Sequence, residues 1–400
     1  MSLPRFVRNS PDLTRLVNEG YALRIQSGYL LVDDVPFVSA EGEVRRGTMI
    51  CPLDTHGDQT AKPATHVMWF AGGIPCDKHG AELKGMLHAR GRTELAKDVV
   101  ADCSFSQKPS PDGYANYYDK AFTYVGLVTG HAQVLQPGVT AATFRPVATD
   151  ESESVFRYID TASSRAGISA HIDKLALPRV AIVGLGGTGS YLLDFLAKLP
   201  SRELHLYDGD IFATHNAFRA PGAASIEELR ERQAKVDYHA GRYEPMRRGV
   251  FPHPAYVTAD NVDELLGMDF VFLAMDPNEH KKLIVDRLAD SRVPFIDTGI
   301  GILNDAAGLS GLIRVTTSLP GNRAHVDSGN LISYAAGGAD DYETNIQVAE
   351  LNALAALLAV IAFKKKYGFY RDEEHELHTL YSVAGNYLVN AYGNSHADGK

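Results

Sequence analysis

The feature that most constrains the fold is a glycine-rich turn that joins an apolar run to a helix-forming segment. Val180–Val183 is entirely apolar, which is typical of a strand buried on both faces. Gly184, Gly186, Gly187 and Gly189 follow it, directly before the helical segment. Glycines allow a tight turn and a close backbone approach, and the amides at a helix N-terminus bind phosphate. The turn therefore predicts an α/β domain that binds a nucleotide.

The sequence beyond the turn alternates between strand-like and helix-like segments. The apolar runs are ELHLYD, DFVFLAMD and PFIDTG, and the helical segments are SYLLDFLAKL, EELRERQAKVDYHAGRY and EHKKLIVDRLAD. This alternation predicts a Rossmann-like, doubly wound and mostly parallel sheet. A last helix, from Asn345 to Lys366, is mostly apolar, and we expect it to be buried at an interface.

A length of 400 residues favours two domains. Residues 1–150 contain β-prone stretches such as ALRI, YLLV, THVMWF and FTYVGLVTG. They predict a smaller, strand-rich mixed domain of unknown role, with partner binding as the working hypothesis. Residues 151–172 have helical apolar spacing and form the expected connector to the α/β domain at 173–400.

Composition excludes several classes of protein. Lysine and arginine number 39 against 49 aspartates and glutamates, so the net charge of −10 offers no general attraction for nucleic acid or an anionic membrane. No apolar run is long enough to span a bilayer, and the first residues do not resemble a secretory signal. Three cysteines, Cys51, Cys76 and Cys103, provide no disulfide framework, so we expect a cytoplasmic protein.

Two acidic residues follow the strand after the glycine turn. Asp208 stands nineteen residues after Gly189, at the end of the next apolar run, and Asp210 is beside it. A carboxylate at this place accepts hydrogen bonds from a ribose. The turn and the acids together describe an NAD(P)- or FAD-dependent oxidoreductase as well as they describe any other nucleotide site.

The residues that follow favour ATP over a dinucleotide. Asn216 and Arg219 come just after the acids, Lys235 begins a helical segment, and Asp276 ends the next apolar strand. A triphosphate requires compensation by arginine and lysine, and Mg²⁺ requires a carboxylate oxygen. Position alone is equally consistent with Asp276 as a helix cap, because Pro277 and a helical segment follow it.

These elements, in this order, resemble the ThiF/MoeB/HesA family of adenylyltransferases and, through it, the adenylation domains of ubiquitin-activating enzymes. The resemblance covers Leu175–Thr317. Where the family has Asp-Asn and an arginine five positions after that aspartate, this chain has Asp276, Pro277 and Lys281. Residues 1–150 resemble an uncharacterised domain found ahead of ThiF-like domains in bacterial modifier operons.

The resemblance implies adenylation of a protein C-terminus. A carboxylate attacks the α-phosphate of ATP, pyrophosphate leaves, and Mg²⁺ assists. The implied substrate is a small ubiquitin-like β-grasp protein that ends in glycine, with a separate conjugating protein as a further partner. The family acts as a homodimer in which an arginine ahead of the glycine loop reaches the ATP of the other subunit. Arg165, or else Arg157, would take that role here.

The resemblance also assigns roles within one subunit. Asp276 would hold Mg²⁺, and Asn216 would orient a phosphate or the substrate carboxylate. Arg219 and Lys235 would neutralise the β and γ phosphates. One of the paired acids would hold the ribose. The remaining alternative is a non-catalytic adenylation fold that binds a partner. The presence of Arg219, Lys235 and Asp276 argues against this alternative.

Cysteines and histidines offer two further hypotheses in the first half of the chain. His66, Cys76, His79 and His88 lie close in sequence, but their spacing matches no zinc template. Cys76 follows two glycines and Pro75, which predicts an exposed turn, although an unreactive thiol is the more common outcome. Because no cysteine follows Cys103, we expect adenylation without a thioester on the second half of the chain.

Overall fold

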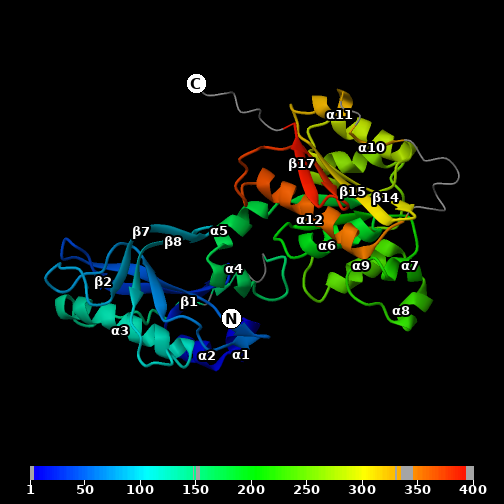
Figure 1. Ribbon diagram of the computed structural model, residues 1–400. Helices are drawn as coiled ribbons and strands as arrows, with labels where there is room; N and C mark the ends of the chain where they lie inside the picture. Colours follow the sequence, from blue (N-terminus) through cyan, green and yellow to red (C-terminus); the bar gives the residue numbers. More distant parts are fainter. Residues whose placement is uncertain (1–3, 147, 150–153, 329–330, 335–345, 393–400) are drawn as a thin grey trace, which may run out of the picture. The chain divides into compact units, whose positions relative to one another are not determined.

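The computed structural model describes residues 4–146, 148–149, 154–328, 331–334 and 346–392. The chain divides into two units, Met1–Asp173 and Lys174–Lys400 (Figure 1). The expected connector at 151–172 therefore belongs to the first unit, although its residues 151–153 lie outside the described ranges. In the described ranges no helix combines the length and the apolar character that a membrane crossing requires.

The first unit is built on a sheet with the strand order β7-β8-β6-β3-β2-β1-β9. All neighbouring strands are antiparallel except β1 and β9, which run parallel. The strands of the sheet are β1 (Ala22–Gln26), β2 (Tyr29–Val38), β3 (Val44–Pro52), β6 (Val67–Ala71), β7 (Leu87–Ala96), β8 (Val99–Ser106) and β9 (Ala148–Thr149). A separate small hairpin joins β4 (Thr55–His56) and β5 (Gln59–Thr60).

One expected strand of this unit is a helix. FTYVGLVTG lies inside α3 (Tyr117–Leu135), so the strand prediction was wrong. The buried side chains of α3 include Tyr117, Ala121, Tyr124 and Val128, whose spacing of three to four places one face of the helix against the sheet. Its start is capped by Asn116, whose side chain accepts the Asp119 N–H at 2.8 Å. Apolar β-branched residues misled the prediction because tertiary burial overrides propensity.

The remaining helices of the first unit are short. They are α1 (Arg5–Asn9), α2 (Pro11–Asn18), α4 (Thr161–Ala166) and α5 (Ser169–Ile172). Helices α2 and α3 pack with the large apolar cluster on one face of the sheet. On the strands that carry the smaller cluster, α4 contacts β3 and α5 contacts β7. The expected helical connector is thus two short helices that cover the first unit's own sheet.

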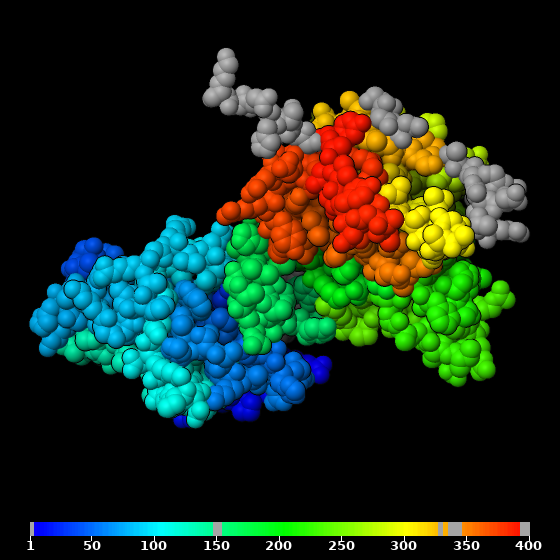
Figure 2. Space-filling view, in the orientation of Figure 1, coloured from blue at the N-terminus to red at the C-terminus, as the bar shows by residue number. Residues whose placement is uncertain are grey.

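The second unit is built on a sheet with the order β12-β11-β10-β13-β14-β15-β16-β17. The first five strands in this order are parallel and the last three pair antiparallel, which confirms the mostly parallel, Rossmann-like sheet. Its strands are β10 (Arg179–Val183), β11 (Glu203–Tyr207), β12 (Val250–His253), β13 (Phe270–Leu273), β14 (Phe295–Asp305), β15 (Gly308–Ser318), β16 (His378–Ser382) and β17 (Tyr387–Ala391). Figure 2 shows β16 and β17, in red, on the surface of this unit.

Helices cover both faces of this sheet. Ala181 and Val183 of β10 point into the apolar cluster that includes α10 (Glu279–Ala289) and the 3-10 helix η2 (Val262–Gly267). The alternate residues of the parallel strands point to the other face, where α6 (Gly187–Leu196) and α12 (Ala349–Lys366) pack together. Short helices complete the unit, namely α7 (Thr214–Ala217) and α11 (Ala324–Ser328), while the 3-10 helix η1 (Asp173–Leu175) spans the boundary.

Two helical expectations change in detail. The segment expected as one helix around 227–243 is two helices, α8 (Ile226–Glu231) and α9 (Lys235–Tyr243), because Arg232 adopts a left-handed backbone with φ of 52°. The last helix begins at Ala349, and Asn345 lies outside the described residues. Helix α12 packs against α6, β14 and β15, so its burial is within its own unit.

Candidate nucleotide site

The glycine-rich turn lies where the order of the parallel strands reverses. The chain continues from β10 to β11 on one side, and later returns to place β13 on the other side of β10. The carboxyl ends of these strands are followed by Gly184, Asp208 and the segment that reaches Asp276. In parallel sheets this reversal point is where ligands bind. The predicted site residues therefore meet at one edge of the sheet.

Glycine is required in this turn for steric reasons. Gly184 has φ of +90°, and a Cβ there would lie 2.4 Å from the Ala274 carbonyl oxygen. A Cβ on Gly189 would lie 1.8 Å from the Gly184 carbonyl oxygen. In contrast, a Cβ on Gly186 would meet no atom within 4 Å, although this residue directly precedes α6. The turn is packed on its inner side and open where the helix begins, as binding of a phosphate requires.

Asn352, a residue that the sequence analysis did not select, supports the turn from behind. Its Oδ1 accepts a hydrogen bond from Thr188 Oγ1 at 2.9 Å, and its Nδ2 donates to the Val348 carbonyl at 3.0 Å. A Cβ on Gly187 would lie 2.3 Å from Asn352 Nδ2. The sequence signal that could have identified it is an amide within the mostly apolar part of α12.

The two acids differ in what holds them. Asp208 is 7% exposed, and its carboxylate accepts the N–H of Leu185 at 2.7 Å and the N–H of Asp210 at 2.9 Å. The Asp210 side chain is 48% exposed and receives Lys235 Nζ at 2.6 Å and the Tyr256 hydroxyl. Asp208 therefore anchors the glycine turn, and Asp210 presents a partly exposed carboxylate beside it.

Lys235 is placed by a break in the helical segment. The N–H of Lys235 donates to the Asp210 carbonyl at 2.9 Å, so the residues before α9 run alongside the acids. Its ammonium is buried and also lies 3.7 Å from Asp208. Burial acts to raise the pKa of Asp210, but hydrogen bonds from Lys235 and Tyr256 hold that pKa below its ordinary value. Asp210 is therefore ionised at neutral pH.

Asn216 and Arg219 bring buried donors that no atom of the described residues accepts. Asn216 is buried and its Oδ1 accepts the Ala213 N–H at 2.9 Å. Within the part of the chain that the structure describes, its Nδ2 has no hydrogen-bond partner, and neither does Nε of Arg219. A buried donor without a partner costs about 1–3 kcal/mol. The pKa of His215 is lowered by burial and by the charges of Arg219 and Lys235, so the two cations act on one region. This region fits an anion.

Asp276 is exposed and follows β13 by three residues. It does not cap the next helix, because Asn278 does, with its side chain accepting the Lys281 N–H at 2.8 Å. Lys281 does not supply the charge of the family's arginine either. Its ammonium is buried, 2.6 Å from Asp297 and 3.2 Å from the Met275 carbonyl.

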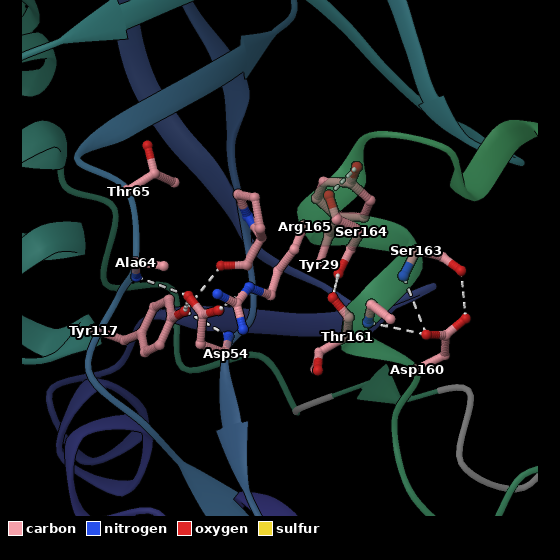
Figure 3. Close-up of polar contacts among 12 residues, drawn as sticks. Tyr29, Asp54, Ala64, Thr65, Tyr117, Asp160, Thr161, Ser163, Ser164 and Arg165 are labelled. Carbon is pink, nitrogen blue, oxygen red and sulfur yellow. Dashed lines mark hydrogen bonds and ion pairs between the residues drawn. The ribbon is translucent and has the colours of Figure 1, made fainter.

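Arg165 lies in the first unit. Its Nε pairs with Oδ1 of the buried Asp54 at 3.2 Å, while 60% of its side chain remains exposed (Figure 3). The other carboxylate oxygen of Asp54 accepts the Ala64 N–H at 2.8 Å and the Tyr117 hydroxyl at 3.1 Å. The expected role toward a nucleotide of another subunit stays a prediction.

The cysteine and histidine candidates lie in the first unit as well. Cys76 is buried, so the expected exposed turn was wrong, and burial raises the pKa of its thiol. It pairs by backbone with Val38 and Glu82, which places it inside a bridge between segments. His66 shares a hydrogen bond of 3.0 Å with Ser106. Among the described residues, no three His, Cys, Asp or Glu side chains are arranged to hold a metal ion.

The described residues fit a nucleotide with a metal-bound phosphate chain. The open start of α6 and the unpartnered donors suit phosphate, and the paired acids suit a ribose. Mg²⁺ is commonly held by one or two carboxylates together with substrate phosphates, so a single carboxylate such as that of Asp276 is sufficient.

Comparison with solved structures gives distant likenesses. The chain is 19% identical to crystallised PaaA, with a TM-score of 0.42, covering 55% of this chain and 65% of that one. It is 16% identical to E. coli MccB crystallised with ATP, with a TM-score of 0.43, covering 58% of this chain and 72% of that one. Likenesses at this level say nothing about substrate. Comparison with curated proteins finds no match.

Sequence families cover both units. Residues 11–161 match the domain of unknown function DUF6791. Residues 160–363 match the ThiF family, which is just over half of the chain. The match favours an adenylyltransferase over the oxidoreductase alternative, which the glycine turn and the paired acids alone did not exclude. The chain therefore belongs to the ThiF family, and its second unit has the adenylyltransferase fold of that family.

Proposed function

We propose that the second unit uses Mg-ATP to adenylate the C-terminal glycine of a small ubiquitin-like protein. The supporting observation is a pair of buried donors, Asn216 Nδ2 and Arg219 Nε, for which the described residues provide no hydrogen-bond acceptor. They come from the segment that follows Asp210, whose carboxylate pairs with Lys235. An anionic ligand at this place would accept hydrogen bonds from these donors and so offset the free energy that an unpaired buried donor costs. A β-grasp substrate follows from the family resemblance of the sequence.

In the proposed reaction a carboxylate oxygen of the substrate attacks the α-phosphorus of ATP. The bond to the bridging oxygen breaks, pyrophosphate leaves with the electron pair, and an acyl-adenylate forms. Arg219 and Lys235 stabilise the negative charge that develops on the leaving group. Asn216 orients a phosphate or the attacking carboxylate, and Asp208 or Asp210 holds the ribose. Mg²⁺, held by Asp276, would add charge neutralisation on the phosphates.

The proposal assigns no covalent role to a thiol. No cysteine follows Cys103, and the three cysteines are buried in the first unit. We propose that the first unit binds a partner, such as the substrate or a conjugating protein, and that the enzyme is a homodimer. Support for partner binding comes from α3, where Phe122, Leu127 and Val134 are exposed.

The test is exchange of labelled pyrophosphate into ATP with a ubiquitin-fold protein that ends in Gly-Gly. The matched control is the same substrate without its two C-terminal glycines. Exchange should require the glycines and Mg²⁺, and Asp276→Ala should abolish it without loss of folded structure. Exchange that survives Asp276→Ala would remove the metal assignment, and ATP binding without any exchange would leave a non-catalytic binding module.

A further inference from the structure

Tyr256 lies beside the paired acids, and no role has been assigned to it. It sits in the loop between β12 and η2, and its hydroxyl donates to the Asp210 carboxylate oxygen that Lys235 does not bind. The loop is fixed at Tyr256 and at the residue that follows it. Asn261 Nδ2 donates to the Tyr256 carbonyl at 3.1 Å, and Val257 is buried in the apolar cluster under the sheet. The position of the side chain is therefore set by the fold.

The ring packs on the backbone between the two acids. A Cβ on Gly209 would lie 2.7 Å from two carbons of the Tyr256 ring, so only glycine at 209 allows this contact. Even so, 57% of Tyr256 is exposed. A large aromatic residue that is held at its tip and on one side, and exposed elsewhere, offers an aromatic surface next to the groups that suit a ribose.

We propose that Tyr256 is the residue on which the purine base of ATP stacks, with the ribose at the adjoining acids. This inference rests on the proposed ATP site and adds how that site distinguishes one nucleotide from another. Asp210, fixed by Lys235 and Tyr256 together, sets the distance between ribose and ring. Aromatic side chains stack on every base, and a purine presents the larger surface.

The hydroxyl and the ring make separate contributions, which variants can distinguish. Tyr256→Phe keeps the ring and removes the hydrogen bond to Asp210. Tyr256→Ala removes both. Tyr387→Ala is the matched control, because Tyr387 is also 57% exposed and also packs on a glycine, Gly385, but belongs to the edge strand β17.

Binding of ATP, CTP and inorganic tripolyphosphate to the full chain, measured by calorimetry, tests the proposal. Tyr256→Ala should lower the affinity for ATP at least about fivefold, which is the lower end of the contribution of a base-stacking contact. It should also reduce the preference for ATP over CTP. The same change should leave the affinity for tripolyphosphate unchanged, because tripolyphosphate has no base. Tyr387→Ala should bind ATP as the wild type does. Tyr256→Phe, which keeps the ring and loses the hydrogen bond to Asp210, should lose clearly less ATP affinity than Tyr256→Ala.

Three results would overturn the inference. They are unchanged ATP affinity in Tyr256→Ala, equal losses for ATP and tripolyphosphate, and a loss in Tyr256→Phe as large as that in Tyr256→Ala. The last two would mean that Tyr256 acts only by supporting the phosphate region or Asp210. An enzyme whose ATP affinity depends on the ring but which exchanges no pyrophosphate would contradict adenylation and leave this inference standing.

Discussion

The backbone N–H of Leu185 donates to Oδ2 of Asp208 across 2.7 Å, which ties the turn after β10 to the residue that follows β11. The other oxygen of the same carboxylate accepts the Asp210 N–H at 2.9 Å. One buried side chain thus fixes both the glycine turn and the acid that pairs with Lys235. Asp208 therefore has a structural role in the glycine turn, because its carboxylate holds the backbone of that turn in place.

Asp208→Asn should destabilise the turn and lower the affinity for ATP. An amide retains one acceptor but turns a donor toward one of the two N–H groups, so a buried hydrogen bond is lost at a cost of about 1–3 kcal/mol. Urea unfolding and the rise of melting temperature with ATP measure the two effects. Asp286→Asn, at an exposed position of α10, is the control and should change neither. If ATP raised the melting temperature of Asp208→Asn as much as that of the wild type, the anchoring role of Asp208 would be contradicted.

The buried carboxylate of Asp297 should matter for folding. It is fully buried between Lys281 Nζ at 2.6 Å and Arg314 Nη2 at 2.8 Å. Asp297→Asn leaves two cations without their partner, and breaking a buried pair costs about 3–5 kcal/mol. Denaturant unfolding should show this loss, whereas Asp263→Asn, which breaks the exposed pair with Arg287, should change stability by less than about 1 kcal/mol. Equal effects of the two changes would refute the argument.

The sequence was sufficient for the parallel sheet and for the positions of the site residues along it. An apolar strand, a glycine turn and an acid at the next strand end are local patterns, and parallel pairing brings strand ends to one edge without further information. The same reasoning placed Asp276 correctly after β13, but not the partner of Lys281. That lysine pairs with Asp297 on the next strand, a contact that depends on the packing of α10 against the sheet.

The wrong predictions have one physical cause. Whether a residue is buried depends on contacts with segments that are distant in sequence. The apolar stretch within α3 is helical because, as a helix, it buries one apolar face against the sheet of the first unit. Cys76 is buried because its backbone pairs with Val38, which is far away in sequence. Tyr256 carries no local motif, and only its packing against Gly209 reveals it. Asn352 had one sequence signal, an amide in a mostly apolar helix, but that signal does not show its contact with the glycine turn.

Stability should fall in mild acid because of His239. Burial, together with Arg242 and Lys235, lowers the pKa of His239 to about 3. The unfolded chain binds a proton near the ordinary histidine pKa and the native state does not, so the free energy of unfolding falls as pH drops between these values. The expected loss from about pH 7 to about pH 5 is about 2 kcal/mol.

Denaturant unfolding of the wild type and of His239→Gln at the two pH values isolates this contribution. The variant should lose that part of the pH dependence, while His375→Gln, at an exposed position, should retain it. An unchanged pH dependence in His239→Gln would show that other groups are responsible.

The thiols should be unreactive in the native enzyme. Cys51, Cys76 and Cys103 are all buried, and burial raises the pKa of each thiol, that of Cys103 to about 12. Thiolate is the reactive form, so iodoacetamide should label the denatured chain at all three positions and the native chain at none. Mass spectrometry counts the labels. Native labelling of Cys76 alone would reopen it as an acceptor of the modifier.

The same placement predicts that no thioester forms on this chain. Incubation with Mg-ATP and a ubiquitin-fold protein ending in Gly-Gly should give pyrophosphate release, and non-reducing gels should show no adduct that dithiothreitol removes. Cys76→Ala should release pyrophosphate at nearly the wild-type rate, because its thiol lies in the first unit and the proposed chemistry belongs to the second. A dithiothreitol-sensitive adduct present in the wild type and lost in Cys76→Ala would mean that the first unit opens to carry the activated carboxyl group.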